Sequence, residues 1–136
     1  MIIGKFKLST DRSMRIKIPN SILKNMCDGE FEGKNLFISC AGDCLKIYSP
    51  IERKQIEEEV IEQNIFSGSN TKKCKIDKSG RITIPVLLGD KVRIGRKSRI
   101  ICVGLGNHIE IWDVDEFNKY SIDFDFSQIF PNLFVP

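Results

Sequence analysis

The chain contains one nine-residue pattern twice, and this repeat constrains its fold more than any other feature. Asp11–Pro19 and Asp77–Pro85 both read D-x-S-x-R-I-x-I-P, at an offset of 66. A later pair of segments, Cys44–Tyr48 and His108–Trp112, aligns at an offset of 64. Two copies of one unit, which differ in length by two residues, are therefore expected to fill positions 1 to about 120.

Each copy is predicted to begin with strands. Cationic and apolar residues alternate in Lys5–Leu8, Arg15–Ile18, Lys73–Ile76 and, less fully, Arg81–Ile84, and a period of two is typical of half-buried strands. The intervening segments are rich in Asp, Ser and Gly, residues that favour turns. We therefore expect each copy to open with a hairpin whose outer face is cationic.

Helices are predicted after these strands and at the end of each copy. Pro19 and Pro85 cannot donate a hydrogen bond within a sheet, so both strands should end there and a short helix should follow. Ser49 and Asp113 each precede a Glu by three residues, the spacing of a capping box at a helix start. The first of these helices exposes mainly glutamates, which we interpret as a solvated face.

A second hairpin is predicted in each copy. In the first copy it joins residues 35–40 with 44–48, and in the second it joins residues 99–103 with 108–112. Short glycine-containing segments separate the two strands of each pair and supply the turns.

Composition excludes several classes of protein. With 136 residues, 41% of them hydrophobic and 29% charged, the chain has room for one compact unit or two very small ones, and it is neither a large enzyme nor a disordered chain. No apolar run has the length of a membrane span or a signal peptide, so we expect a cytoplasmic protein. The cysteines are odd in number and lack a C-x-x-C spacing, which predicts free, mostly buried thiols: Cys27, Cys40, Cys44, Cys74 and Cys102.

Charge alternates along the chain in four blocks. The net charge is +5 over residues 1–27, −5 over 28–71, +8 over 72–99 and −5 over 100–136, which sums to the net charge of +3. Each copy thus begins with a cationic part and continues with an acidic one. This asymmetry is typical of a surface that faces nucleic acid.

The repeated motif resembles a known family. D-x-x-x-R occurs twice and each time runs into an I-P dipeptide, Phe66–Gly68 precedes the second copy, and Gly104–Asp113 ends in I-E-I-W-D. Over roughly residues 1 to 120 these features resemble MraZ, the bacterial regulator of the division and cell-wall gene cluster. The sequence departs from the family at Met14, where the first copy usually has Gly. Both copies also lack the Arg that commonly follows the I-P helix start, and Leu88-Gly89-Asp90 shortens that helix in the second copy.

The resemblance implies a fold and a domain organisation. It implies the swapped-hairpin fold of the AbrB superfamily, in the α+β class and mainly β. Two tandem units then form one pseudo-twofold, β-barrel-like domain with short flanking helices. We expect a first repeat at residues 1–63, a linker at 64–71, a second repeat at 72–120 and a Phe-rich tail at 121–136.

The resemblance also implies a ring-like homo-oligomer that binds promoter repeats in double-stranded DNA. A two-stranded ribbon fits the major groove, where cations neutralise phosphates and an Arg can bond guanine. The cations of the two hairpins are the candidate DNA contacts: Lys5, Lys7, Arg12, Arg15, Lys17, Lys73, Lys75, Lys78 and Arg81. Parity places the strand cations of each copy on one face, with Lys5, Lys7, Arg15 and Lys17 in the first copy and Lys73, Lys75 and Arg81 in the second. Asp11 and Asp77 are expected to cap the turns and hold the motif arginines.

Other functions are less well supported by the residues. His108 is the only histidine and has no nucleophile at motif spacing, and the G-x-G at Gly104 lacks the third glycine of a dinucleotide site. We therefore predict no catalytic residue, metal, cofactor, small-molecule substrate or membrane contact.

An AbrB-type antitoxin, which binds DNA and a toxin partner, is the main alternative, although such antitoxins usually carry one copy of the unit. An RNA-binding protein or a ring-forming scaffold is also conceivable. The basic strands carry no aromatic stacking platform of the kind that single-strand readers use. Duplex DNA bound by a cytoplasmic, nucleoid-associated regulator is thus the favoured interpretation.

Overall fold

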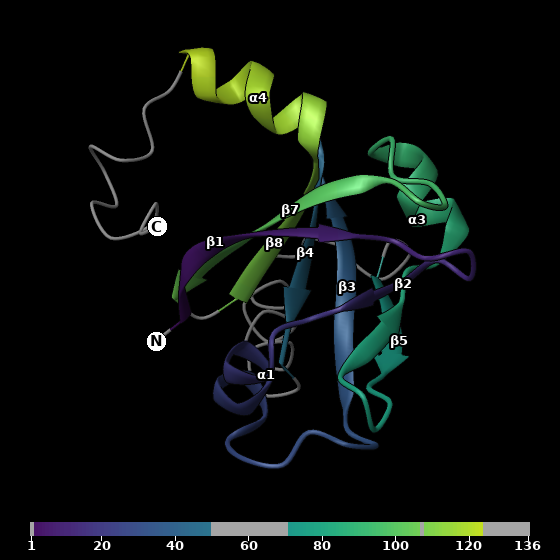
Figure 1. Ribbon diagram of the computed structural model, residues 1–136, viewed down its shortest axis with the longest axis vertical. Coiled ribbons are helices and arrows are strands. Elements are labelled where there is room, and N and C mark those ends of the chain that lie inside the picture. The colour runs from purple at the N-terminus through teal and green to yellow at the C-terminus, as the bar shows by residue number, and fades with distance from the viewer. Residues whose placement is uncertain (1, 50–70, 107, 124–136) are drawn as a thin grey trace, which may run out of the picture.

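The computed structural model describes residues 2–49, 71–106 and 108–123, and the fold is a mainly β, α+β arrangement (Figure 1). The described part of the chain has eight strands and three short helices. The strands are β1 (Ile2–Ser9), β2 (Arg15–Lys17), β3 (Asn35–Ala41), β4 (Cys44–Tyr48), β5 (Thr71–Lys75), β6 (Arg81–Thr83), β7 (Arg99–Gly106) and β8 (His108–Asp113). The helices are α1 (Asn20–Cys27), α3 (Val86–Lys91) and α4 (Val114–Asp123).

The strands form two antiparallel sheets. Six strands lie in the order β1-β7-β8-β4-β3-β5, and β2 pairs with β6 in a separate two-stranded sheet. The two edge strands of the large sheet, β1 and β5, do not pair with each other. The expected β-barrel-like closure is therefore absent from the described strands, which leave the sheet open.

Strand pairing crosses between the two halves of the chain. β1 pairs with β7, β5 pairs with β3, and β2 pairs with β6. The prediction that each copy opens with a hairpin is thus wrong in its pairing, because the two arms on either side of the turn join different sheets. The predicted second hairpins are confirmed as β3–β4 and β7–β8.

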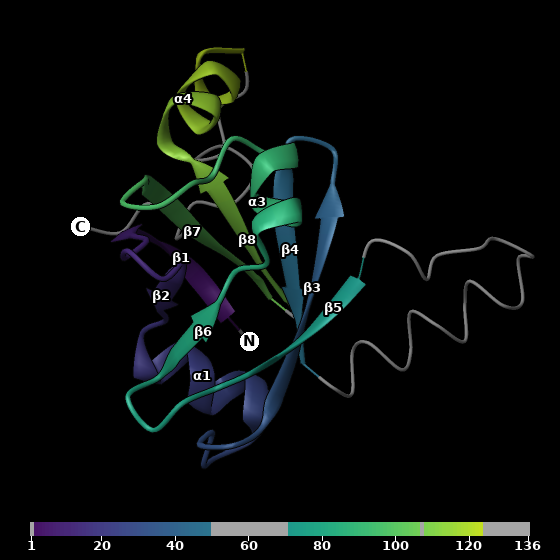
Figure 2. The same cartoon turned by 90° about the vertical axis from the view of Figure 1, so that its right-hand side faces the viewer.

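One apolar core lies between the two sheets. The ribbon contributes Ile16 and Ile82, which are paired with each other and each 1% exposed. The large sheet contributes fully buried residues such as Ile47 and Ile109. Figure 2 shows β2 and β6 side by side, with α1 below and α3 above them. Both halves therefore bury their apolar faces in the same core.

The helices begin where the prolines predicted. Pro19 and Pro85 precede α1 and α3, and α1 buries Ile22, Leu23 and Met26. α4 starts at the second predicted cap, since Asp113 Oδ2 accepts from the backbone N–H groups of residues 115 and 116, both at 3.1 Å. No helix in the described ranges is long and apolar enough to cross a membrane.

α4 covers a second apolar cluster on the outer face of the large sheet. This cluster consists of Cys44, Ile101, Val103, Trp112 and Phe117. The helix predicted after Ser49, most of the predicted linker and most of the Phe-rich tail lie outside the described residues.

All five cysteines are free, as predicted, and all except Cys40 are buried. Burial raises the pKa of the Cys102 thiol to about 12 and that of Cys74 to about 11. For Cys44, burial and then Glu110 raise the pKa to about 12. These buried thiols are therefore protonated at neutral pH and act as small apolar side chains.

Candidate nucleic-acid interface

Each D-x-S-x-R segment folds into a turn that its own aspartate closes. Asp11 Oδ1 accepts hydrogen bonds from the backbone N–H groups of Ser13, at 2.8 Å, and Arg15, at 2.9 Å. The second carboxylate oxygen accepts from Arg15 Nε at 2.8 Å. One side chain therefore fixes the turn and also orients the guanidinium of the motif arginine.

The second turn repeats this geometry. Asp77 Oδ1 accepts from the backbone N–H groups of Ser79, at 2.8 Å, and Arg81, at 2.9 Å, and Oδ2 accepts from Arg81 Nε at 3.0 Å. In both turns the Asp backbone N–H also donates to the Arg carbonyl. The arrangement is thus a property of the motif and not of one local environment.

Both aspartates remain ionised at neutral pH. The pKa of Asp11 is lowered chiefly by the hydrogen bond from the Arg15 backbone N–H, and the pKa of Asp77 is lowered in the same way by Arg81. Each carboxylate is therefore available as an acceptor for its arginine under physiological conditions.

The two-stranded sheet of β2 and β6, called the ribbon below, brings motif cations from both halves together. Lys17 lies directly opposite Arg81, and Arg15 lies opposite Thr83. Ile16 and Ile82 point into the core, so these polar side chains point outward. The outer face of the ribbon therefore combines two arginines and a lysine from sequence positions that are far apart.

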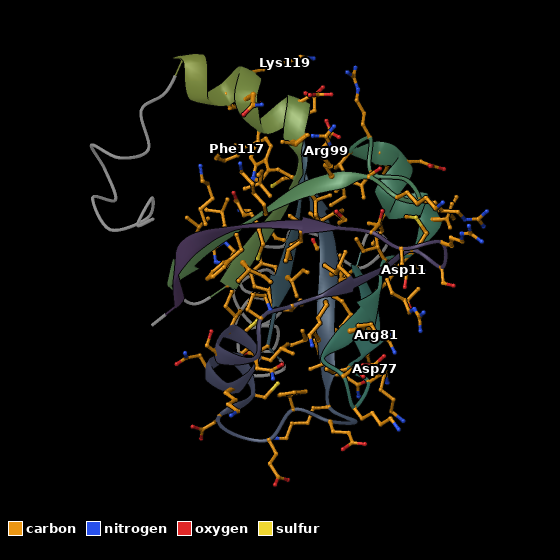
Figure 3. The ribbon with its side chains drawn as sticks, in the orientation of Figure 1. Asp11, Asp77, Arg81, Arg99, Phe117 and Lys119 are labelled. Carbon is orange, nitrogen blue, oxygen red and sulfur yellow. The ribbon has the colours of Figure 1, made fainter. Side chains whose placement is uncertain are left out.

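The two turns lie at opposite ends of the ribbon because its strands are antiparallel. Figure 3 shows Asp11 above and Asp77 with Arg81 below, on the same side of the molecule. Arg12 and Lys78, at the tips of the two turns, are exposed. Arg15 and Arg81 keep 38% and 37% of their side-chain surface exposed while bonded to their aspartates. Five of the nine predicted DNA contacts thus line one surface.

The other four predicted contacts lie on the large sheet. Lys5 is opposite Val103 on the face that α4 covers, and its Nζ is 5.8 Å from the Phe117 ring centroid. Lys7 is on the same face of β1, and Lys73 and Lys75 are exposed on β5. The expectation that the strand cations of each copy share one face is therefore wrong, because β1 and β2 belong to different sheets, and so do β5 and β6.

A further basic turn, which no sequence motif marks, lies beside the first motif turn. Thr10 Oγ1 donates to the Gly95 carbonyl at 2.6 Å and accepts from the Ser98 backbone N–H at 2.7 Å. The tip of this turn carries the exposed residues Arg96 and Lys97. The only sequence signal for it is the +8 charge of residues 72–99.

His108 and the polar and aromatic residues that follow it on β8 belong to the sheet. His108 stacks on Tyr48, with ring centroids 5.2 Å apart, and burial lowers its pKa. Glu110 accepts a hydrogen bond from Trp112 Nε1 at 3.0 Å. Within the described ranges, no three His, Cys, Asp or Glu side chains come together to hold a metal ion.

Comparisons with known proteins give a consistent set of relatives. The family model described as "MraZ protein, putative antitoxin-like" matches residues 65–132. A protein named transcriptional regulator MraZ from Natranaerobius thermophilus is 26% identical over 88% of this chain and 86% of that protein. Another of the same name from Cytophaga hutchinsonii is 27% identical over 98% of this chain and 94% of that protein. A solution structure from Pyrococcus horikoshii is 18% identical, covers 82% of this chain and 88% of that chain, and superposes with a TM-score of 0.35.

Proposed function

Because the chain belongs to the MraZ family, whose model matches half of its residues, we propose that it is a sequence-specific DNA-binding transcriptional regulator. The relatives that bear the name transcriptional regulator span nearly the whole chain. This role is not an enzymatic one, and it places the protein at the chromosome, in the cytoplasm.

The ribbon is the observation that carries this proposal. A two-stranded antiparallel ribbon can enter the major groove, and an arginine there can donate two parallel hydrogen bonds to guanine. Arg15 and Arg81 bond their aspartates through Nε, which orients the guanidinium before DNA arrives. Lys17, Arg12 and Lys78 add positive charge along the same surface and suit contacts to phosphates.

The architecture is proposed to be of the swapped-hairpin type. Strand pairing between the halves supports this, and so do two hydrogen bonds at equivalent positions: the Ile18 backbone N–H donates to Gly80, at 3.0 Å, and that of Ile84 donates to Met14, at 2.7 Å. In this proposal residues 1–63 and 72–120 are the two repeats, 64–71 link them, and 121–136 are a tail.

A ring-like homo-oligomer completes the proposed mechanism. The described part of one chain presents a single ribbon, whose binding to one DNA site is expected to be weak. Copies held in one assembly bind spaced DNA repeats with a raised effective concentration, so avidity develops without any single tight contact. Lys5, Lys7, Lys73 and Lys75 remain predicted contacts, on the outer face of the large sheet.

The deciding experiment replaces both motif arginines. Arg15→Ala with Arg81→Ala should abolish the preference for duplex DNA from upstream of the gene over a shuffled duplex. Fold and oligomeric state should be retained, because both side chains point outward from the ribbon. Binding is measured by fluorescence anisotropy at several salt concentrations, with circular dichroism and light scattering as checks of structure.

Arg93→Ala is the matched control, because this exposed arginine is held by Glu116 at 2.8 Å instead of by a motif aspartate. It should bind like the unmodified protein. An unchanged preference in the Arg15→Ala, Arg81→Ala variant would contradict the assigned role of the ribbon. If the unmodified protein bound neither duplex at moderate salt, the proposed regulatory function would be contradicted and the antitoxin alternative would be favoured.

A further inference from the structure

The two ends of the ribbon differ in the turn that accompanies them. At the first end, Thr10 ties the turn of residues 95–98 to the first motif turn. At an offset of 64, the equivalent residues are 31–34, and they contact the second motif turn through Ile76. The Ile76 backbone N–H donates to Lys34 at 2.8 Å, and its carbonyl accepts from Gly33 at 2.9 Å. The Thr10 backbone N–H likewise donates to the Ser98 carbonyl at 3.0 Å, so the two ends share this backbone contact.

The tips of these two equivalent turns carry different charges, and Lys34, which ends the second turn, donates through Nζ to the Cys27 carbonyl at 2.9 Å. The tip at the first end carries Arg96 and Lys97, whereas Glu32 and Gly33 occupy the same positions at the other end. The motif tip Arg12 is thus joined by two further cations, while its counterpart Lys78 is accompanied by an acid. The first end therefore carries the larger positive charge and attracts DNA phosphates more strongly than the second.

The side chains of Arg96 and Lys97 are not engaged by other residues in the described part of the chain. Neither makes an ion pair or a side-chain hydrogen bond to any residue that the structure describes, and both are exposed. Arg93, three residues earlier, is instead held by Glu116 on α4. The two tip cations can therefore bind a ligand without breaking an existing contact.

The two equivalent tips share a left-handed backbone position but differ in the residue that occupies it. Lys97 has a φ of 54°, in the left-handed region that favours glycine, and the equivalent Gly33 has a φ of 77°. A lysine at such a position is strained where a glycine is not. The chain thus holds a positive charge at a tip where the fold alone would favour glycine.

We propose that Arg96 and Lys97 contact backbone phosphates of the duplex, so that each chain holds DNA mainly through the Arg12 end of its ribbon. This inference rests on the proposed function and deepens it. Phosphate contacts position a protein on the duplex but carry no direct sequence information. The pair should therefore add affinity for every duplex and should leave discrimination to the ribbon arginines.

Salt-titrated binding tests this assignment. For B-DNA, log K falls with log salt concentration with a slope of about 0.9 per neutralised phosphate. Arg96→Gln with Lys97→Gln should therefore reduce the slope by about two units for each chain that contacts the duplex, and should weaken the native and shuffled duplexes by the same factor. Arg93→Gln is the matched control, in which a neighbouring arginine loses its charge but the slope should not change.

The outcomes separate this inference from the function on which it rests. If the unmodified protein prefers the native duplex and the Arg96→Gln, Lys97→Gln variant keeps the full slope, the inference is wrong and the regulator stands. A loss confined to the native duplex would also overturn it, because the two residues would then read bases. If the unmodified protein binds no duplex, both proposals fail together.

Discussion

The two motif turns place different residues in the same left-handed backbone position. Met14 has a φ of 61° and its equivalent Gly80 a φ of 82°. A Cβ on Gly80 would lie 3.1 Å from Leu23 Cδ1, and a Cβ on Gly89 would lie 3.1 Å from Met14 Cε. Gly89 is the equivalent of Leu23, so a large and a small residue have changed places between the two ends. The departure at Met14 is thus compensated by the departure at Gly89.

Restoring the family residue at this turn should therefore destabilise the protein. Met14→Gly relieves backbone strain of about 1–2 kcal/mol. It also removes a side chain that is only 4% exposed, and truncation of a buried methionine costs about 2–5 kcal/mol. We expect a net loss of about 2 kcal/mol in the free energy of unfolding, the difference between the centres of these two ranges, measured by urea denaturation. A variant as stable as the unmodified protein would show that no cavity forms above Gly89.

At the scale of the element, the two carboxylate oxygens in each motif turn accept hydrogen bonds from different groups. Oδ1 holds the backbone and Oδ2 holds the arginine. Asp11→Asn with Asp77→Asn keeps an acceptor for the backbone, but the amide nitrogen cannot accept from Arg Nε. We expect the fold to persist and the preference for the native duplex to fall, because Arg15 and Arg81 lose their orientation. Equal preference before and after the change would show that DNA alone orients the arginines.

The same turns should make stability depend on pH in acid. The pKa values of Asp11 and Asp77 are lowered in the folded protein from the ordinary value of 3.8. The stabilisation is therefore fully present above that value and is lost as the pH falls through the lower, folded pKa. The Asn double variant should lack this component. Its urea denaturation midpoint should therefore fall less than that of the unmodified protein as the pH is lowered below about 4. Parallel acid profiles for the two proteins would contradict this assignment.

At the scale of the whole molecule, neither half can complete its sheets alone. β1 needs β7, β5 needs β3, and each strand of the ribbon needs the other. Fragments of residues 1–63 and 64–136 should each be largely unfolded when expressed separately, because their apolar strand faces and edges would be exposed. Mixing the fragments should restore the β-sheet signal in far-ultraviolet circular dichroism. A native-like spectrum from one fragment alone would show that the halves are independent domains.

Short-range structure followed directly from the sequence. The turns at Asp11 and Asp77, the helix starts after Pro19 and Pro85, and the hairpins β3–β4 and β7–β8 depend on residues close together in the chain. Their determinants are local: proline geometry, side-chain hydrogen bonds to the adjacent backbone, and short glycine-containing connections. The repeated motif also identified the aspartates of the two turns and the cations of the ribbon as candidate site residues.

Only the tertiary structure decided which strands pair and which cations share a surface. Alternation of polar and apolar residues determines the face of the strand on which a side chain lies, but it does not determine which strand is the neighbour. The alternation therefore predicted that Lys5 and Arg15 lie on one face. In the structure β1 and β2 belong to different sheets, because both strands bury their apolar faces in one core from opposite sides. No sequence motif marks Arg96 and Lys97, for a similar reason. Thr10 brings their turn beside the first motif turn from more than 80 residues away in sequence, and such a contact exists only once the core has formed.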